Sequence, residues 1–370
     1  MLQLTRPAVT TPQDWLTEGA TPERGRSVEA DVAPPLEEAW VYDADAGFGN
    51  VSPLLLGDVV LVATRQGEVH GINLATGKRE GSSEFGEAVE GTPVVQDGIL
   101  YVPNAWGRKT LFAYDLRHGR TLWKSNGTPV EAGLLLLDGT LYAADVEGVL
   151  RAIDAANGEV LWEEALDTMT TIHAAPLRAG EGRIVVADDR GRVRALSTEQ
   201  EERFLWQQEL EAPVYSTPAA DENTVYIPTT RGQLFALDAA QGHVRWHYAI
   251  EDATVRFTAP ALSGTDLVLA GTDGVVRMLD AETGDVRWTY QAKEAITAPP
   301  LFTRDVIYIG TMGKKLYALD RATGELLWEE ELRGRIKSGM AAREGYLVVL
   351  TEPSHVYLFK TKTSDYVTSQ

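Results

Sequence analysis

The side chains that could do chemistry in this sequence do not form a catalytic set. His243 and His247 are four residues apart, the spacing at which two metal ligands share one face of a helix. The residues around Trp246 predict a turn and a strand instead, so this geometry does not apply. The chain has no cysteine, which excludes disulfides, thiolate metal sites and cysteine nucleophiles. We therefore expect no metal site, no cofactor and no catalytic residue.

Two further segments could bind a ligand, and both have simpler interpretations. Asp43, Asp45 and Asn50 offer oxygen ligands for calcium, but they lack the twelve-residue spacing and terminal glutamate of a calcium-binding loop. A plain turn is expected there. Trp106 stands in the loop segment NAWGRKT, where an exposed aromatic side chain is more typical of a contact residue than of a cofactor platform. No Ser–His–Asp arrangement and no glycine-rich phosphate loop accompanies them.

Charge and hydropathy exclude two functional classes. The 370 residues carry a formal net charge of −20 at pH 7, which repels nucleic-acid backbones. No stretch approaches the roughly 18 consecutive apolar residues of a membrane-spanning helix, so membrane association would need a partner or a removed anchor. The first residues lack the pattern of a secretory signal peptide, which predicts either a cytoplasmic protein or the removal of a targeting segment.

The dominant signal is a repeated phrase, Ala-x-Asp-x-x-x-Gly-x-x-x-Trp, with a period of about 40 residues that is typical of β-propellers. The copies, one of which has an inserted residue, end at Trp123, Trp162, Trp206, Trp246, Trp288 and Trp328. Trp40 stands further upstream on the same lattice, and an eroded copy has Gly81 where its tryptophan should stand. We expect these seven tryptophans to dock against neighbouring blades.

Each repeat is predicted to form four short strands. In the copy that ends at Trp123, strands are expected over residues 92–95, 99–102, 110–115 and 121–124. The aspartate of the phrase can accept backbone N–H bonds across the turn that it precedes. The glycine supplies the positive φ that the end of such a turn needs. The tryptophan then lies on the outermost strand of its blade.

Counting the strands predicts a closed, eight-bladed propeller. Seven units run from Val51 to about Gly339, and the segment MAAREGYLVVLTEPSHVYLFK supplies three more strands. The segment EEAWVYD around Trp40 supplies one unpaired strand near the N-terminus. Pairing the two completes an eighth blade and removes the open sheet edges. The expected fold is all-β, with one propeller over residues 37–363 and a C-terminal tail over 364–370.

Residues 1–36 form an N-terminal arm that is rich in proline, threonine and glutamate and shows little periodicity. We expect this arm to lie across the propeller as an extended strap with Trp15 as its anchor, because an exposed tryptophan in an unattached arm would be a liability. A partly disordered arm is the alternative.

The repeated phrase resembles the tryptophan-docking motif of the PQQ-like propeller repeats over about residues 37–363. Two branches share that fold, the quinoprotein alcohol dehydrogenases and the non-catalytic periplasmic propellers of the BamB type. Quinoprotein dehydrogenases typically place a cysteine pair beside the quinone, and this chain has none. The stretch GRVRALSTEQEERFLWQQEL, residues 191–210, is similar to the matching blade of BamB-type proteins.

The resemblance implies a monomeric, non-catalytic scaffold that binds a protein partner, such as an outer-membrane barrel-assembly protein. It also implies a location in the periplasm or at the inner face of the outer membrane. In BamB-type proteins a loop between blades contacts the partner, and the matching loop here, residues 166–174, is shorter and lacks the family's paired leucines and arginine. The expected contact residues are Met169, Ile172 and His173 in this loop, with Trp106 and Arg108 in the second blade.

Two alternatives stay open. A quinone-dependent oxidoreductase would show quinone absorbance and activity with an artificial dye. A surface or secreted propeller that binds a carbohydrate or a peptide would need an aromatic-lined axial pocket.

Overall fold

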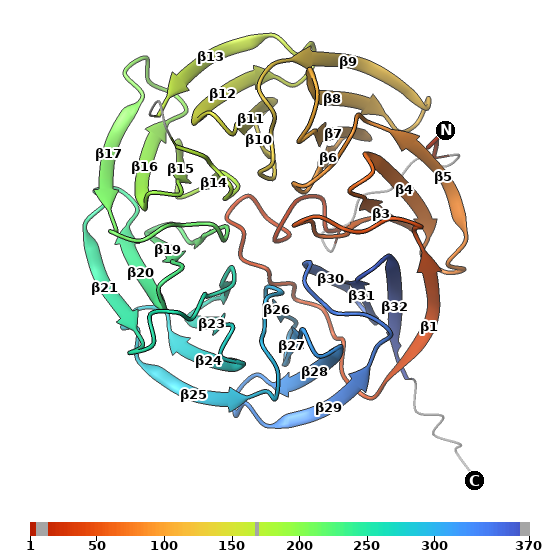
Figure 1. The fold of residues 1–370 in the computed structure, drawn as a ribbon, viewed down its shortest axis with the longest axis vertical. Coiled ribbons are helices and arrows are strands. Elements are labelled where there is room, and N and C mark those ends of the chain that lie inside the picture. Colours follow the sequence, from red (N-terminus) through yellow and green to blue (C-terminus); the bar gives the residue numbers. More distant parts are fainter. Residues whose placement is uncertain (5–13, 167–169, 363–370) are drawn as a thin grey trace.

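The computed structural model describes residues 1–4, 14–166 and 170–362, and this part of the chain contains 32 β-strands and no helix. The strands form eight four-stranded antiparallel sheets around a common axis (Figure 1). The predicted all-β, eight-bladed propeller is confirmed. Within the described residues, no helix has the length and apolar character needed to cross a membrane. The predicted tail, 364–370, lies outside the described residues.

Each of blades 1 to 7 follows the chain from the axis outward. Blades 1 to 3 consist of β2 (Leu54–Leu56), β3 (Val59–Ala63), β4 (Glu68–Asn73) and β5 (Arg79–Glu84); β6 (Val94–Gln96), β7 (Ile99–Pro103), β8 (Lys109–Asp115) and β9 (Arg120–Asn126); and β10 (Leu135–Leu137), β11 (Thr140–Ala144), β12 (Val149–Asp154) and β13 (Val160–Ala165). Blades 4 and 5 consist of β14 (Leu177–Arg178), β15 (Arg183–Ala187), β16 (Arg192–Ser197) and β17 (Phe204–Glu209); and β18 (Ala219–Ala220), β19 (Thr224–Pro228), β20 (Gln233–Asp238) and β21 (Val244–Ala249). Blades 6 and 7 consist of β22 (Ala261–Ser263), β23 (Asp266–Ala270), β24 (Val275–Asp280) and β25 (Val286–Gln291); and β26 (Leu301–Phe302), β27 (Val306–Gly310), β28 (Lys315–Asp320) and β29 (Leu326–Glu331).

Blade 8 closes the ring with strands from both ends of the chain. Its inner strands are β30 (Met340–Arg343), β31 (Tyr346–Thr351) and β32 (His355–Thr361), and its outermost strand is β1 (Leu36–Asp43). β1 pairs antiparallel with β32, from Leu36 opposite Thr361 to Asp43 opposite His355. The predicted closure by the strand around Trp40 is confirmed.

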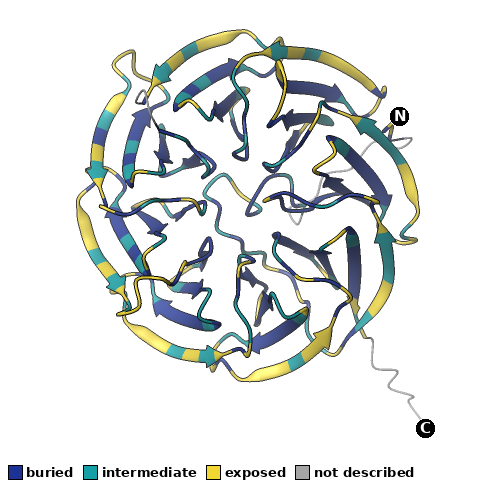
Figure 2. Ribbon diagram, in the orientation of Figure 1, coloured by how far each residue is buried: buried dark blue, intermediate teal, exposed yellow. Residues whose placement is uncertain are grey.

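Burial follows the position of each strand in its blade. All residues of β2 and β3 are buried, because the inner strands lie between neighbouring blades, whereas β13 alternates exposed and half-buried residues at the rim (Figure 2). The apolar core is thus distributed around the ring as clusters between blades. This arrangement leaves the turns and loops at the two ends of the blades to form the functional surfaces.

The repeated phrase acts through a turn and the tryptophan that packs on it. Asp154 Oδ1 accepts the N–H of Ala156 at 2.7 Å, and Gly158 completes the turn with a φ of +79°. The indole of Trp123, from the preceding blade, packs on Gly158 and donates its Nε1–H to the carbonyl oxygen of Ala155 at 2.9 Å. The equivalent indole bond to a turn carbonyl is made by Trp40, Trp206, Trp246 and Trp288.

The two ends of the blades form two distinct faces. The turn face carries the turns between first and second strands and between third and fourth strands, such as residues 179–182 and 155–159. The loop face carries the loops between second and third strands and the connections between blades, such as residues 104–108 and 127–134. Because successive strands are antiparallel, each loop can be assigned to one face from its place in the repeat.

Residues 14–35, which we call the strap, cross the centre of the ring (Figure 1). Trp15 is only 1% exposed and exchanges two backbone hydrogen bonds of 2.9 Å with Leu55, on the inner strand of blade 1. Strap carbonyl oxygens accept backbone N–H bonds from the inner strands or first turns of blades 2, 4, 5, 6, 7 and 8, at Val95, Arg178, Ala220, Leu262, Phe302 and Gly345. The strap therefore satisfies the free inner edges of the sheets.

Candidate functional site

Trp106 and Arg108 lie on the loop face, in the loop between β7 and β8, and both side chains are exposed. The indole of Trp106 is 61% exposed. Asn104 fixes the loop from within, because its Oδ1 accepts the N–H of Ala88 at 3.1 Å and its Nδ2 donates to the carbonyl oxygen of Lys109 at 2.6 Å. A fixed loop presents an exposed tryptophan to a partner with little loss of conformational entropy.

The neighbouring connection, residues 127–134, continues this surface toward blade 3. Gly127 donates its N–H to the carbonyl oxygen of Arg108 at 3.1 Å, and Val130 donates to that of Asn104 at 3.1 Å. Glu131, in the same connection, is half-buried. The loop of Trp106 and the connection that carries Glu131 are thus joined by two backbone hydrogen bonds.

His173 extends this exposed surface toward blades 4 and 5. Its Nδ1 lies 3.4 Å from Glu131 Oε2, and its ring centroid lies 4.9 Å from that of Tyr215, whose residue is 43% exposed. Sequence reasoning missed Glu131 and Tyr215. A signal was present, because Glu131, His173 and Tyr215 each follow the same apolar position in successive connections.

The structure places one of the predicted contact residues, Ile172, differently. Ile172 is fully buried in the cluster between blades 3 and 4, so its side chain is not available to a partner. It occupies the repeating apolar position of the connections, like Val130 and Val214, which are also buried. The selection of Ile172 for exposed apolar character is therefore corrected. Met169 lies outside the described residues.

The strap places buried side chains near the centre of the propeller. Arg24 is fully buried, and its Nη2 donates to the carbonyl oxygens of Leu134 at 2.7 Å and Pro176 at 3.1 Å. These two carbonyls precede the inner strands β10 and β14 at the loop-face end. The strap backbone also bonds to the inner strands of other blades, such as β18 at Ala220 and β22 at Leu262.

The two buried arginines of the strap are held by one carboxylate, one hydroxyl and main-chain carbonyl oxygens. Arg26 Nη2 donates to Glu18 Oε1 at 2.8 Å, and Arg26 Nη1 donates to the carbonyl oxygen of Pro260 at 3.2 Å. Burial lowers the pKa of Arg24 to about 10, and the nearby negative charge of Glu18 partly offsets this by raising the pKa. The guanidinium therefore stays protonated at neutral pH. Burial likewise lowers the pKa of Arg26.

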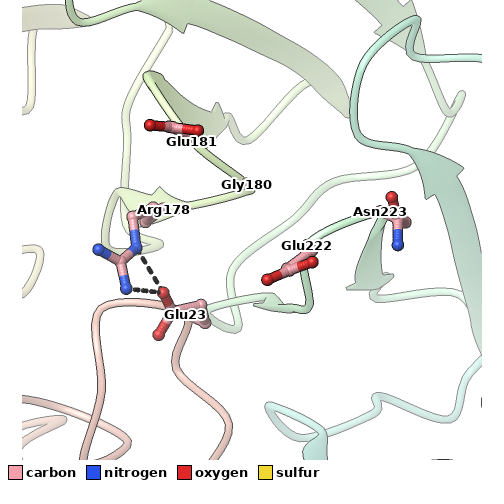
Figure 3. A pocket seen from close by; sticks show the side chains of 6 residues that line it. All are labelled: Glu23, Arg178, Gly180, Glu181, Glu222 and Asn223. Carbon is pink, nitrogen blue, oxygen red and sulfur yellow. Dashed lines mark hydrogen bonds and ion pairs between the residues drawn. The ribbon is translucent and has the colours of Figure 1, made fainter.

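An acidic pocket of about 420 Å³ opens where the strap meets blades 4 and 5 on the turn face (Figure 3). It is lined by Glu23, Glu181 and Glu222 with Arg178, and Arg178 points toward Glu23 and forms an ion pair with it. Nothing in the sequence pattern indicated this pocket, because its residues come from three separate segments. In the described part of the chain, no group of three histidine, aspartate or glutamate side chains is placed to bind a metal ion.

Comparison with known proteins gives one family model that covers most of the chain. The model described as outer membrane protein assembly factor BamB matches residues 27–174, 146–297 and 272–366. The outer membrane protein assembly factor BamB of Nitrosomonas eutropha is 26% identical over 193 residues, which cover 52% of this chain and 37% of that protein. The crystal structure of BamB from Moraxella catarrhalis has a TM-score of 0.75 at 17% identity and covers 88% of this chain and 99% of that one, a likeness of fold.

Catalytic propellers are also similar. The quinohemoprotein alcohol dehydrogenase of Comamonas testosteroni is 32% identical over 167 residues, which cover 38% of this chain and 23% of that enzyme. The matched regions thus span only 37% and 23% of the length of these two relatives.

Proposed function

Because the chain belongs to the family of the outer membrane protein assembly factor BamB, we propose that it is a non-catalytic scaffold that binds another protein during outer-membrane protein assembly. Its site of action is then the periplasm or the inner face of the outer membrane. A rigid propeller holds several loops in fixed geometry, so a partner binds with little ordering cost on this side.

The observation that carries the proposal is a contrast between the centre of the ring, which the strap crosses, and the loop face, which presents exposed side chains. The strap crosses the centre of the ring and holds the buried side chains of Arg24 and Arg26 there, so this chain's own residues lie where an axial ligand would be expected (Figure 1). The loop face keeps exposed aromatic and charged side chains. The buried strap at the centre and the exposed side chains of the loop face together support binding of a macromolecule at the surface.

The candidate contact surface is the row on the loop face, formed by Trp106, Arg108, Glu131, His173 and Tyr215. Tryptophan, tyrosine and arginine are the residue types that dominate the energetics of protein interfaces. The row is continuous through the backbone bonds between the Arg108 loop and residues 127–130, the Glu131–His173 pair and the His173–Tyr215 ring contact.

The test is an affinity pull-down of the tagged full-length protein from its host's membrane fraction, identified by mass spectrometry. We expect an outer-membrane barrel-assembly protein in the wild-type eluate and a loss of about tenfold or more with a Trp106→Ala/Arg108→Ala double variant. Phe204→Ala is the matched control, because Phe204 is 55% exposed on the outer strand β17, away from the loops. Recovery of no such protein, or equal recovery with both variants, would overturn the proposal.

A quinone-dependent oxidoreductase is the second candidate, favoured by the 32% identity to the Comamonas testosteroni dehydrogenase. A quinone on the axis would have to displace the strap and its buried arginines, Arg24 and Arg26. Incubation with pyrroloquinoline quinone and calcium, followed by absorbance spectroscopy and a dye-reduction assay with alcohols, separates the two candidates. Stoichiometric quinone binding with dye reduction would favour the enzyme.

A further inference from the structure

The interface between blades 1 and 2 is the place where the repeat loses its docking tryptophan. In blades 2 to 7 the tryptophan of the fourth strand stands opposite an alanine or methionine of the third strand, as Trp162 stands opposite Ala152. In blade 1 the same register pairs Gly71 with Gly81. Both side chains that would fill this interface are therefore missing from the blade itself.

The first residues of the chain fill the vacated space. Leu2 is fully buried and Leu4 is 5% exposed. A Cβ atom at Gly71 would lie 2.5 Å from Leu2 Cδ1, and a Cβ atom at Gly81 would lie 2.4 Å from the carbonyl oxygen of Met1. The two glycines thus make room for this segment, which a larger side chain at either position would exclude.

The segment also reproduces the hydrogen bond of the tryptophan that it replaces. Docking tryptophans donate Nε1–H to the carbonyl oxygen of the first turn residue after the third strand of the next blade, as Trp123 does to Ala155. Leu116 is the equivalent residue of blade 2, and its carbonyl oxygen accepts the N–H of Leu4 at 2.7 Å. Met1 Sδ lies 2.7 Å from the Cβ position of Gly119, the turn glycine on which an indole would pack.

Polar groups from both blades bind the main chain of Leu2. Its N–H donates to Ser83 Oγ, on β5, at 2.9 Å, and its carbonyl oxygen accepts the hydroxyl of Tyr114, on β8, at 2.8 Å. Tyr114 is itself a departure from the repeat, because the equivalent positions of blades 1 and 3 to 7 are Ile72, Ile153, Leu196, Leu237, Leu279 and Leu319. Three departures, Gly71, Gly81 and Tyr114, therefore converge on one four-residue segment.

We propose that the cleft between the rims of blades 1 and 2 is a binding site for an extended Leu-x-Leu peptide, occupied here by the chain's own residues Met1–Leu4. The two leucine side chains supply the apolar contact and the backbone supplies the hydrogen bonds, so recognition depends on a short strand with leucines two positions apart. The site lies on the rim and is separate from the loop-face row of the proposed function.

Binding of a labelled peptide tests the site directly. The probe is a fluorescent hexapeptide with the sequence of residues 1–6, and the protein is the full chain with Leu2→Asp and Leu4→Asp, which vacates the cleft. We expect saturable binding to this variant, and binding weaker by about tenfold or more to the wild type, where the tethered segment competes at high effective concentration. A peptide with aspartate at both leucine positions is the control.

Gly81→Trp supplies the second arm of the test. Because a Cβ at Gly81 meets atoms of the N-terminal segment first, an indole at this position should take the docking place and expel the segment. We expect the Leu2→Asp/Leu4→Asp change to lower the urea midpoint in the Gly81 background and to have no effect in the Gly81→Trp background. Equal loss in both backgrounds, or equal peptide binding to all variants, would overturn the proposal.

Discussion

Glu18 Oε1 lies 2.8 Å from Arg26 Nη2, and the two side chains are 12% and 4% exposed. The pair lies within the strap, where Glu18 neutralises one of two buried guanidinium groups whose terminal nitrogens otherwise donate to hydroxyl and carbonyl oxygens. A buried charge without its counter-ion is far less stable than the pair. The strap therefore depends on Glu18 to keep Arg26 inside the ring.

Glu18→Gln should lower the free energy of unfolding by about 3–5 kcal/mol, because it removes the counter-charge of a buried arginine while keeping the shape of the side chain. Urea unfolding followed by tryptophan fluorescence measures the effect. The matched control is Glu330→Gln on the outer strand β29, where the side chain is exposed. If both variants lost the same amount, the ion pair would not stabilise the strap.

Trp40→Ala should weaken the closure of the ring. The indole donates to the carbonyl oxygen of Leu74 at 2.8 Å and packs on Gly77 of blade 1, so its loss removes a contact between β1 and the next blade. We expect a decrease in unfolding free energy of about 3 kcal/mol. Trp106→Ala should change it by less than about 0.5 kcal/mol, because an exposed loop side chain contributes little. Comparable losses would assign Trp40 no special role in closure.

A pair of glycine substitutions separates backbone strain from tryptophan docking. Gly139 and Gly158 have φ values of +77° and +79°, but a Cβ at Gly139 has nothing within 4 Å, whereas one at Gly158 lies 2.7 Å from Trp123 Cδ2. Gly139→Ala should cost about 1 kcal/mol from left-handed backbone strain alone. Gly158→Ala should cost more, because its Cβ also meets the indole. In a Trp123→Ala background this extra loss of stability should disappear, as measured by thermal unfolding. Persistence of the excess without the indole would contradict the docking explanation.

Acid should destabilise the propeller through its turn aspartates. Arg245 donates to Asp238 at 2.7 Å and Arg287 donates to Asp280 at 2.6 Å, and these hydrogen bonds lower the pKa of both carboxyl groups. The folded state then binds fewer protons than the unfolded state, so the stabilisation is complete above the usual pKa of about 3.9 and is lost as the pH falls through the lower folded pKa.

Urea midpoints measured between pH 7 and pH 3 check this prediction. The Asp280→Asn variant should be less stable than the wild type at pH 7. The difference should shrink as the pH falls below about 3.9, because Asp280 then binds a proton in the unfolded wild type before it does so in the folded state. A difference that stays constant over this range would show that the carboxylate charge of Asp280 does not contribute to stability.

The repeat by itself determined the architecture. The tryptophan lattice predicted eight blades, and the unpaired strand around Trp40 predicted the closure that β1 and β32 form. These features are local and periodic: a turn such as Asp154 to Gly158 is encoded within five residues. A pattern that repeats around the ring averages out the uncertainty of any single copy, which is why it can be read without a structure.

The tertiary structure alone decided what the non-repeating residues do. The strap has no periodicity, and several of its partners, such as Leu134 for Arg24 and Arg178 for Pro22, lie more than 100 residues away. The exposed row on the loop face was only partly predictable, because the contacts of His173 with Glu131 and Tyr215 arise from connections that the closed ring brings together. Ile172 shows the same limit, since its burial depends on the packing of two adjacent blades. Sequence periodicity determines which strands pair, whereas contacts among aperiodic segments depend on the geometry of the completed ring.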